Sequence, residues 1–166
     1  MILDNFKFNL IKEDSKFIKQ FKKILKDAGE FELYYGIPET EKVWSMIDLV
    51  HPLFYFISLD NTYIGYIGFS TYDEIIYEPE IYLFPEYRNK GYGTKILSYF
   101  IDTLSSVGID GKIIKNFRTD VRVENLVSQK MIMNCGFIEE DCIGWIVHIE
   151  NEDNSMIPVK SYKLSL

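Results

Sequence analysis

Cysteine, histidine and positive charge are scarce in this sequence, and each scarcity argues against a class of protein. Of the 166 residues only Cys135 and Cys142 are cysteines, too few for a disulfide framework, so we expect two thiols. His51 and His148 lie far apart without partners at metal-ligand spacing, which argues against a metal site. Lys and Arg number 18 against 25 Asp and Glu. The net charge of -7 lacks the positive excess that drives nonspecific binding to nucleic acid.

Long apolar segments are lacking as well. No run of about 18 apolar residues occurs, so no membrane-spanning helix is predicted. The amino terminus shows no basic stretch followed by an apolar segment, the pattern of a secretory signal. We therefore expect a cytoplasmic protein that binds neither membranes nor nucleic acid.

Apolar and aromatic side chains are abundant. Hydrophobic residues make up 47% of the chain, aromatic residues 16% and charged residues 26%, which is typical of a globular protein. A length of 166 residues corresponds to about one domain. Because no repeat or linker interrupts the sequence, we expect a single domain over residues 1–166.

Hydrophobic periodicity predicts alternating strands and helices. Pro79 within one strand predicts either a β-bulge or an edge position, and Asp60-Asn61 predicts a hairpin turn. The order predicts a mixed α/β sheet with helices on both faces. Strands are expected at 6–10, 53–59, 63–72, 75–84, 117–123, 137–149 and 159–164, and helices at 17–25, 40–50, 96–107 and 127–135.

A glycine-containing loop joins the strand at 75–84 to the next helix. The loop reads Arg88-Asn-Lys-Gly91-Tyr-Gly93, and the helix begins directly after it. Backbone N–H groups at such a helix start, together with the helix dipole, form an anion site. A tight strand-to-helix turn without a ligand is the alternative. The Walker A pattern is not present.

Two motifs resemble those of the GNAT superfamily of acyl-CoA-dependent N-acetyltransferases. The loop matches R/Q-x-x-G-x-G/A, and a second pattern, N-x-x-(A/S)-x-x-(L/M)-x-x-x-x-G-F, is met by five residues. These are Asn125, Ser128, Met131, Gly136 and Phe137. The resemblance covers about residues 6–166. It implies a mostly antiparallel central sheet that splays between the fourth and fifth strands, at 75–84 and 117–123.

The resemblance also implies acetyl-CoA as cosubstrate and a set of residues that hold it. The main chain of Leu83 and Phe84 would pair with the pantetheine arm, and the Leu83 N–H would polarise the thioester carbonyl. Asn125 would hydrogen-bond the arm near the thioester, with Ser128 one turn further on. The coenzyme pyrophosphate would lie on the loop amides of Arg88, Asn89, Lys90, Gly91, Tyr92, Gly93 and Thr94.

Amine acetylation needs a group that removes a proton, because a lysine-like ammonium is only about 0.04% neutral at pH 7. Carboxylates near the splay are the candidates. We rank Glu80 first, Asp120 second and Glu78 third. Glu78 and Glu80 share a strand face unless a bulge intervenes. For each carboxylate, a solvated charge at a strand edge is the alternative interpretation.

The sequence departs from the family pattern at one position. Many members carry a tyrosine that protonates the departing thiolate, but this chain has Ile132 there. Tyr82, Tyr87 and Cys135 are unranked substitutes. We expect an acetyltransferase acting on an amine-bearing small molecule or peptide, as a monomer or a homodimer. The alternative function is a non-catalytic acyl-CoA-binding or regulatory module.

Overall fold

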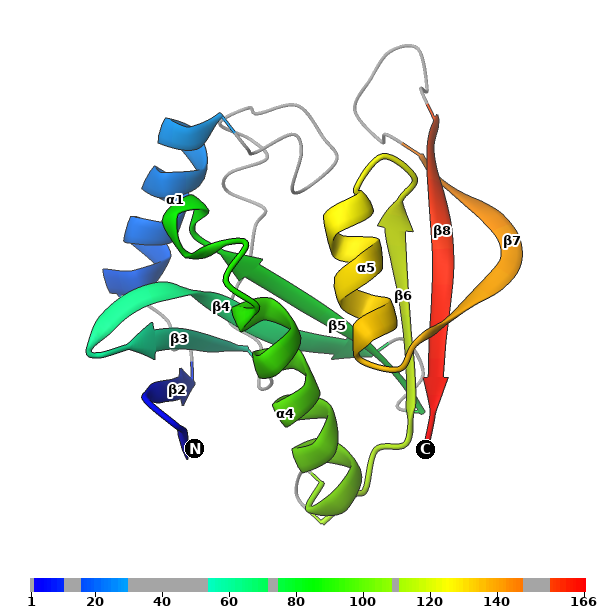
Figure 1. Ribbon diagram of the computed structural model, residues 1–166, viewed down its shortest axis with the longest axis horizontal. Coiled ribbons are helices and arrows are strands. Elements are labelled where there is room, and N and C mark those ends of the chain that lie inside the picture. Colours follow the sequence, from blue (N-terminus) through cyan, green and yellow to red (C-terminus); the bar gives the residue numbers. More distant parts are fainter. Residues whose placement is uncertain (1, 11–15, 30–53, 72–74, 109–110, 148–155) are drawn as a thin grey trace.

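One mixed sheet forms the centre of the protein. The computed structural model describes residues 2–10, 16–29, 54–71, 75–108, 111–147 and 156–166. In these ranges the strand order is β1-β2-β3-β4-β5-β6-β8-β7 (Figure 1). The strands are β1 Ile2–Leu3, β2 Phe6–Leu10, β3 Tyr55–Leu59, β4 Thr62–Thr71, β5 Ile76–Leu83, β6 Asn116–Arg122, β7 Ile138–Val147 and β8 Met156–Ser165. The helices are α1 Lys16–Ala28, α4 Tyr92–Ser106, α5 Leu126–Asn134 and the 3-10 turn η1 Pro85–Tyr87.

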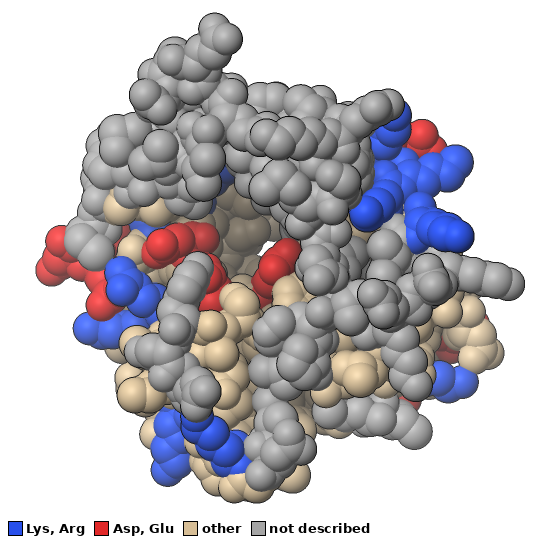
Figure 2. Space-filling model, turned by 180° about the vertical axis from the view of Figure 1, so that it is seen from behind, with Lys and Arg blue, Asp and Glu red and all other residues tan. Residues whose placement is uncertain are grey.

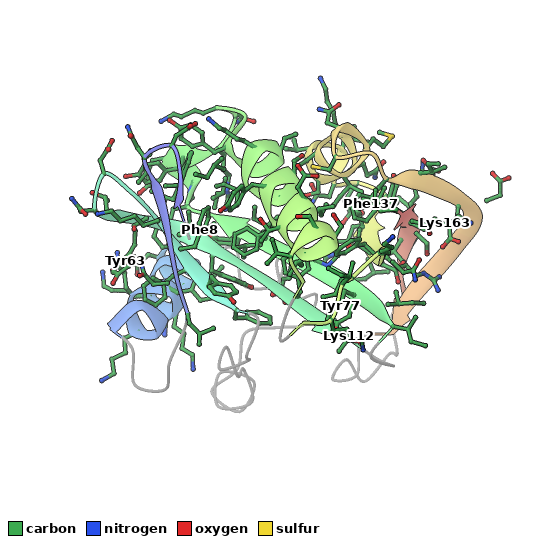
Figure 3. The ribbon with its side chains drawn as sticks, turned by 90° about the horizontal axis from the view of Figure 1, so that it is seen from below. Phe8, Tyr63, Tyr77, Lys112, Phe137 and Lys163 are labelled. Carbon is green, nitrogen blue, oxygen red and sulfur yellow. The ribbon has the colours of Figure 1, made fainter. Side chains whose placement is uncertain are left out.

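Helices cover both faces of the sheet, as predicted. Figure 3 shows α4 and α5 on one side and α1 on the other. On the α4 side, Phe8 of β2 and Phe137, which directly precedes β7, belong to one buried cluster with the apolar stripe of α4. On the α1 side, Phe21 and Leu25 pack against aromatic side chains of β4 and β5, with Tyr63 at the margin. The predicted helix at 40–50 lies outside the described residues, as do His51 and His148.

The β3–β4 hairpin has the predicted turn and an unpredicted irregularity. Asp60 and Asn61 have φ values of 49° and 68°, the left-handed conformation that two-residue hairpin turns require. Further along, Ile57 pairs with Gly65 and Ser58 with Tyr63. Ile64 is therefore an extra residue in β4, a β-bulge that shifts the register beside the carboxyl end of β5.

The sheet opens between β5 and β6, where the two strands run parallel. They pair only at Ile76–Asn116 and Tyr77–Phe117, and then diverge into a V (Figure 1). The fold class predicted from the sequence is therefore confirmed, including the splay. Pro79 lies past the last paired position and stays in regular register opposite Phe69 of β4. Of the two alternatives for Pro79, the edge is correct and the bulge is wrong.

None of the helices in the described ranges has both the length and the apolar character needed to cross a lipid bilayer.

Cys135 differs from its expected place inside a helix: it is the C-cap residue of α5 and is half-buried.

Candidate active site

The backbone at the end of β5 offers hydrogen-bonding groups to the V. Phe84 N–H donates to Ile64 O at 2.8 Å, which fixes the phase of the antiparallel ladder between β4 and β5. Because N–H groups alternate in direction along a strand, those of Leu83 and Ile81 face away from β4. Past Tyr77 that side of β5 is the opening between β5 and β6. This orientation suits the role predicted for the Leu83 N–H.

Phe84 is less suited to the same role. Its N–H is used by Ile64, and its carbonyl oxygen accepts from Tyr87 N–H at 2.9 Å. The prediction that the Phe84 main chain pairs with the pantetheine arm therefore does not fit its N–H group. Ile81, which sequence reasoning did not include, has the orientation that Phe84 lacks. Ile81 lies two residues before Leu83 in the same strand, so their N–H groups point to the same side. This spacing could have identified Ile81 from the sequence.

The glycine loop is held in place by Arg88. Its Nε donates to Leu83 O at 2.8 Å, and its guanidinium lies over the Tyr82 ring, 5.0 Å from the centroid. The Arg88 N–H donates to Pro85 O at 3.2 Å, closing η1. Because both groups have partners within the protein, Arg88 shapes the loop, and the phosphate contact predicted for its amide does not fit this geometry.

The loop ends at the start of α4 in the way an anion site requires. Gly91 is the N-cap with φ 76°, and Asn89 also has a positive φ of 58°. The Lys95 N–H donates to Gly91 O, so the amides of Tyr92, Gly93 and Thr94 precede that first helical bond. A Cβ built on Gly91 would meet no atom within 4 Å. The residues thus leave room for a phosphate group beside these amides.

The second motif lies at the start of α5. Asn125 is the N-cap, and its Oδ1 accepts from Ser128 N–H at 3.1 Å. The nitrogen of the same amide remains the group suited to donate to a cosubstrate. Ser128 is half-buried in the first turn. The buried Gln129 donates to the carbonyl oxygens of Arg122 and Val123, each at 2.9 Å, which ties α5 to the end of β6.

The three candidate carboxylates lie on one face of the sheet. The regular β4–β5 register puts Glu78 and Glu80 on the α1 face, and the parallel pairing Ile76–Asn116 puts Asp120 on the same face. Glu80 and Asp120 stand four residues beyond that pair, on opposite arms of the V. Figure 2 shows this side of the molecule, with acidic side chains on either side of a central hollow.

Glu80 lies beside a buried tyrosine. It is half-buried, and its Oε1 accepts a hydrogen bond from the Tyr66 hydroxyl. Burial raises the pKa of Glu80 above its usual range, and the hydrogen bond from Tyr66 partly opposes that rise. A base whose pKa is closer to the working pH transfers protons more effectively. Glu80 therefore stays the first-ranked candidate for the base.

Asp120 and Glu78 have different surroundings. Asp120 is exposed, and its Oδ1 accepts from the buried Ser161 hydroxyl at 2.6 Å. Glu78 is half-buried and pairs across the ladder with Ser70. Both carboxylates lie on the same sheet face as Glu80, so the three together give this face a negative charge.

The position of the missing tyrosine is apolar. Ile132 is 3% exposed and part of the core on the α4 side. The Cys135 thiol forms hydrogen bonds to α4. Ser98 Oγ donates to its sulfur at 3.4 Å, and the thiol donates to Thr94 O at 3.6 Å. Burial raises the pKa of this thiol. Tyr82 is buried on the α1 side, and Tyr87 is half-buried beside Lys90.

The splayed sheet, with its glycine loop leading into α4, is an α/β arrangement suited to a phosphate-bearing ligand beyond strand ends. The model of the acetyltransferase (GNAT) family matches residues 20–137, and the chain belongs to this family. The predicted enzyme class is thereby confirmed, an acetyltransferase with acetyl-CoA as its cosubstrate. No curated protein sequence matches the chain.

Solved structures of low sequence identity share the fold. The acetyltransferase from Salmonella typhimurium that modifies the N-terminal serine of ribosomal protein L7/L12 is 15% identical, with a TM-score of 0.74 over 99% of this chain and 96% of that one. Spermidine N-acetyltransferase from Vibrio cholerae, in complex with CoA and spermine, is 15% identical, with a TM-score of 0.69 over 98% and 96%. A GNAT-family acetyltransferase from Bacillus anthracis is 17% identical, with a TM-score of 0.71 over 98% and 95%.

Proposed function

We propose that the protein transfers the acetyl group of acetyl-CoA to a primary amine in the V between β5 and β6, with Glu80 as general base. The observation that carries the proposal is the juxtaposition on β5 of a half-buried carboxylate, Glu80, and an N–H group directed into the V, that of Leu83. Acetyl-CoA supplies the acetyl group as a thioester.

Each group has a separate task in this proposal. The Leu83 N–H donates to the carbonyl oxygen that gains negative charge, an electrostatic effect typically worth a few kcal/mol. Glu80 receives the proton of the acceptor ammonium, directly or through water. The nitrogen lone pair then forms the C–N bond as the C–S bond breaks, the electron pair leaves with sulfur, and the surplus proton on nitrogen passes through water to the thiolate of CoA. Asn125 and the amides from Asn89 to Thr94 hold the cosubstrate in position.

The acceptor is proposed to be cationic. Glu78, Glu80 and Asp120 all belong to the sheet face on which the amine would approach. The similar folds include one enzyme that modifies a protein N-terminus and one in complex with spermine. Both types of acceptor are amines, so both belong in the test.

The decisive experiment measures release of CoA thiol with a panel of amines: spermine, an amino sugar, a lysine-like small amine and a peptide with N-terminal serine. Turnover of any of them supports an enzyme, and binding of acetyl-CoA is measured in parallel by thermal shift. Stabilisation by acetyl-CoA without turnover of any amine would overturn the proposal.

That outcome would favour a second function, a non-catalytic acyl-CoA-binding module. One observation supports it. Ile132 occupies the position of the expected general acid and is packed into the core, so this position offers no proton.

A further inference from the structure

We infer that Tyr66 is a positioning residue for Glu80: its hydroxyl orients the carboxylate and stabilises the ionised form that accepts the proton. The inference rests on the proposed function, because it assigns Tyr66 a role through the proposed base. Tyr66 pairs with Tyr82 across the β4–β5 ladder, and Glu80 is its diagonal neighbour on the same face. The Tyr66 hydroxyl donates to Glu80 Oε1.

Aromatic rings pack against the Tyr66 ring on several sides, so its hydroxyl has a fixed orientation. Tyr66 is fully buried. The Phe21 ring of α1 meets it edge-on with centroids 4.9 Å apart, and the Phe54 ring stacks on it at 5.8 Å. Tyr82 stacks at 6.5 Å on its β5 side. A ring enclosed in this way delivers its hydroxyl at low entropic cost, which is what a positioning residue needs.

The residue opposite Glu80 contributes to the same arrangement. Gly68 pairs with Glu80 across the ladder. A Cβ at Gly68 would approach the Phe54 ring to 2.6 Å, so Phe54 occupies the space that a side chain would take. Glu80 thus has an aromatic ring over its cross-strand neighbour and a phenol directed at its carboxylate. Burial by these rings raises the pKa of Glu80, and the hydrogen bond from Tyr66 lowers it.

Tyr66 itself stays protonated through the reaction. Burial, followed by the negative charge of Glu80, raises the pKa of the Tyr66 hydroxyl well above its usual value. It is therefore a constant donor at neutral pH and not a second base. The proton removed from the amine goes to Glu80, and the hydroxyl proton of Tyr66 remains on its oxygen.

Other titratable groups lie on the same face of the sheet as Glu80. Tyr82 and Glu78 flank it on β5, and Asp120 lies on the other arm of the V. From α1, Phe21 and Leu25 are the buried residues on this side, with Lys22 half-buried beside them and Lys19, Lys23 and Lys26 exposed. All these groups are unchanged in Tyr66→Phe, so the variant isolates the hydroxyl.

The test is an NMR titration of the glutamate side-chain carboxyl carbons, with Glu80 assigned by its loss in Glu80→Gln. In Tyr66→Phe we expect the titration midpoint of Glu80 to rise, because the ionised carboxylate loses a hydrogen bond. Tyr77→Phe is the matched control. It removes a hydroxyl from a buried tyrosine on the opposite face of β5 and is expected to leave the midpoint unchanged (Figure 3). An unchanged midpoint in Tyr66→Phe would overturn the inference.

A second measurement replaces the Glu80 carboxylate and observes the Tyr66 side chain. With tyrosines labelled at the phenol carbon, Glu80→Gln is expected to shift the Tyr66 resonance and leave that of Tyr77 in place. If Tyr66→Phe failed to fold, as judged by circular dichroism, this measurement would still decide the matter: an unmoved Tyr66 resonance would contradict the inference.

Kinetics with the fastest amine of the panel separate stabilisation of the ionised carboxylate from mere packing. Relative to the parent at each pH, kcat/KM of Tyr66→Phe is expected to fall about tenfold at pH 5.5 and to approach the parent at pH 9, with the KM for acetyl-CoA unchanged. A loss that is equal at all pH values would indicate a packing role only. If Glu80→Gln were as active as the parent, the proposed base would be wrong, whereas the NMR titration would still report on the pair.

Discussion

Gly93 of α4 lies directly against Met131 of α5: a Cβ at Gly93 would stand 2.7 Å from the Met131 sulfur. The second glycine of the loop therefore has a packing reason to be small, in addition to any contact with a phosphate. The first glycine, Gly91, has open space around it and a positive φ instead. The two motifs of the sequence meet at this contact between α4 and α5.

Gly93→Ala should destabilise the protein by about 1–3 kcal/mol, because the methyl group overpacks the contact with Met131. In a Met131→Ala background the same change should cost less or stabilise, since alanine favours helices over glycine by about 1 kcal/mol. Urea unfolding of the four variants measures this coupling. An equal cost in both backgrounds would show that Met131 is not the cause.

Gly91→Glu should abolish the stabilisation by acetyl-CoA and leave the fold intact. The parent should gain about 2.7 kcal/mol when acetyl-CoA is a hundredfold above its Kd. The added carboxylate would occupy the open space beside the amides of α4 and repel the pyrophosphate. Gly91→Asn is the matched control, because asparagine tolerates a positive φ and carries no charge. Normal binding by Gly91→Glu in thermal shift would mean that the loop is only a turn.

The three carboxylates can be separated by Glu80→Gln, Asp120→Asn and Glu78→Gln. We expect Glu80→Gln to lower turnover at neutral pH by about 10²–10⁴-fold, with acetyl-CoA binding unchanged. The defect should shrink as the pH rises toward the pKa of the acceptor amine, where the acceptor is already neutral without a base. A residue that only positions the acceptor would show no such recovery. Full activity in all three variants would contradict the assignment of a base.

The raised pKa of Glu80 also predicts a pH dependence of stability. Since burial raises the folded-state pKa above the unfolded one, the folded state holds the proton more tightly. The free energy of unfolding contributed by Glu80 is then largest below the unfolded pKa and is lost as the pH rises through the folded pKa. Compared with Glu80→Gln, the parent should lose stability as the pH rises above the ordinary glutamate pKa of about 4.3. Parallel stability curves for the two proteins would contradict this.

The central hairpin followed from local signals in the sequence, whereas the splay was implied by the family resemblance. Asp60-Asn61 predicted a turn whose two residues indeed have positive φ. The same dipeptide occurs at Asp4-Asn5, where Leu3 pairs with Phe6 and Asp4 has a φ of 49°. The short strand β1 was missed because only two residues precede that turn in the strand, too few for a visible alternation.

The details of the site depended on tertiary contacts that no local pattern contains. Tyr66 is 14 residues from Glu80, and the bond between them requires the β4–β5 register. That register in turn determines which amides of β5 face the V. The N–H of Phe84 is bonded to Ile64, the bulge residue of β4. Because the sequence does not reveal this bond, Phe84 was predicted to pair with the cosubstrate, whereas the ladder favours Ile81.

The placement of β8 between β6 and β7 has a consequence for folding during synthesis. β6 and β7 do not pair with each other. β7 pairs only with residues 156–165, and β6, which meets β5 at two positions, finds its other neighbour in the same residues. A nascent chain that has reached Val147 therefore still exposes an unpaired edge of β6, which includes Asp120 and its future partner position at Ser161. One arm of the V can thus be completed only late, when β8 inserts between two strands made before it.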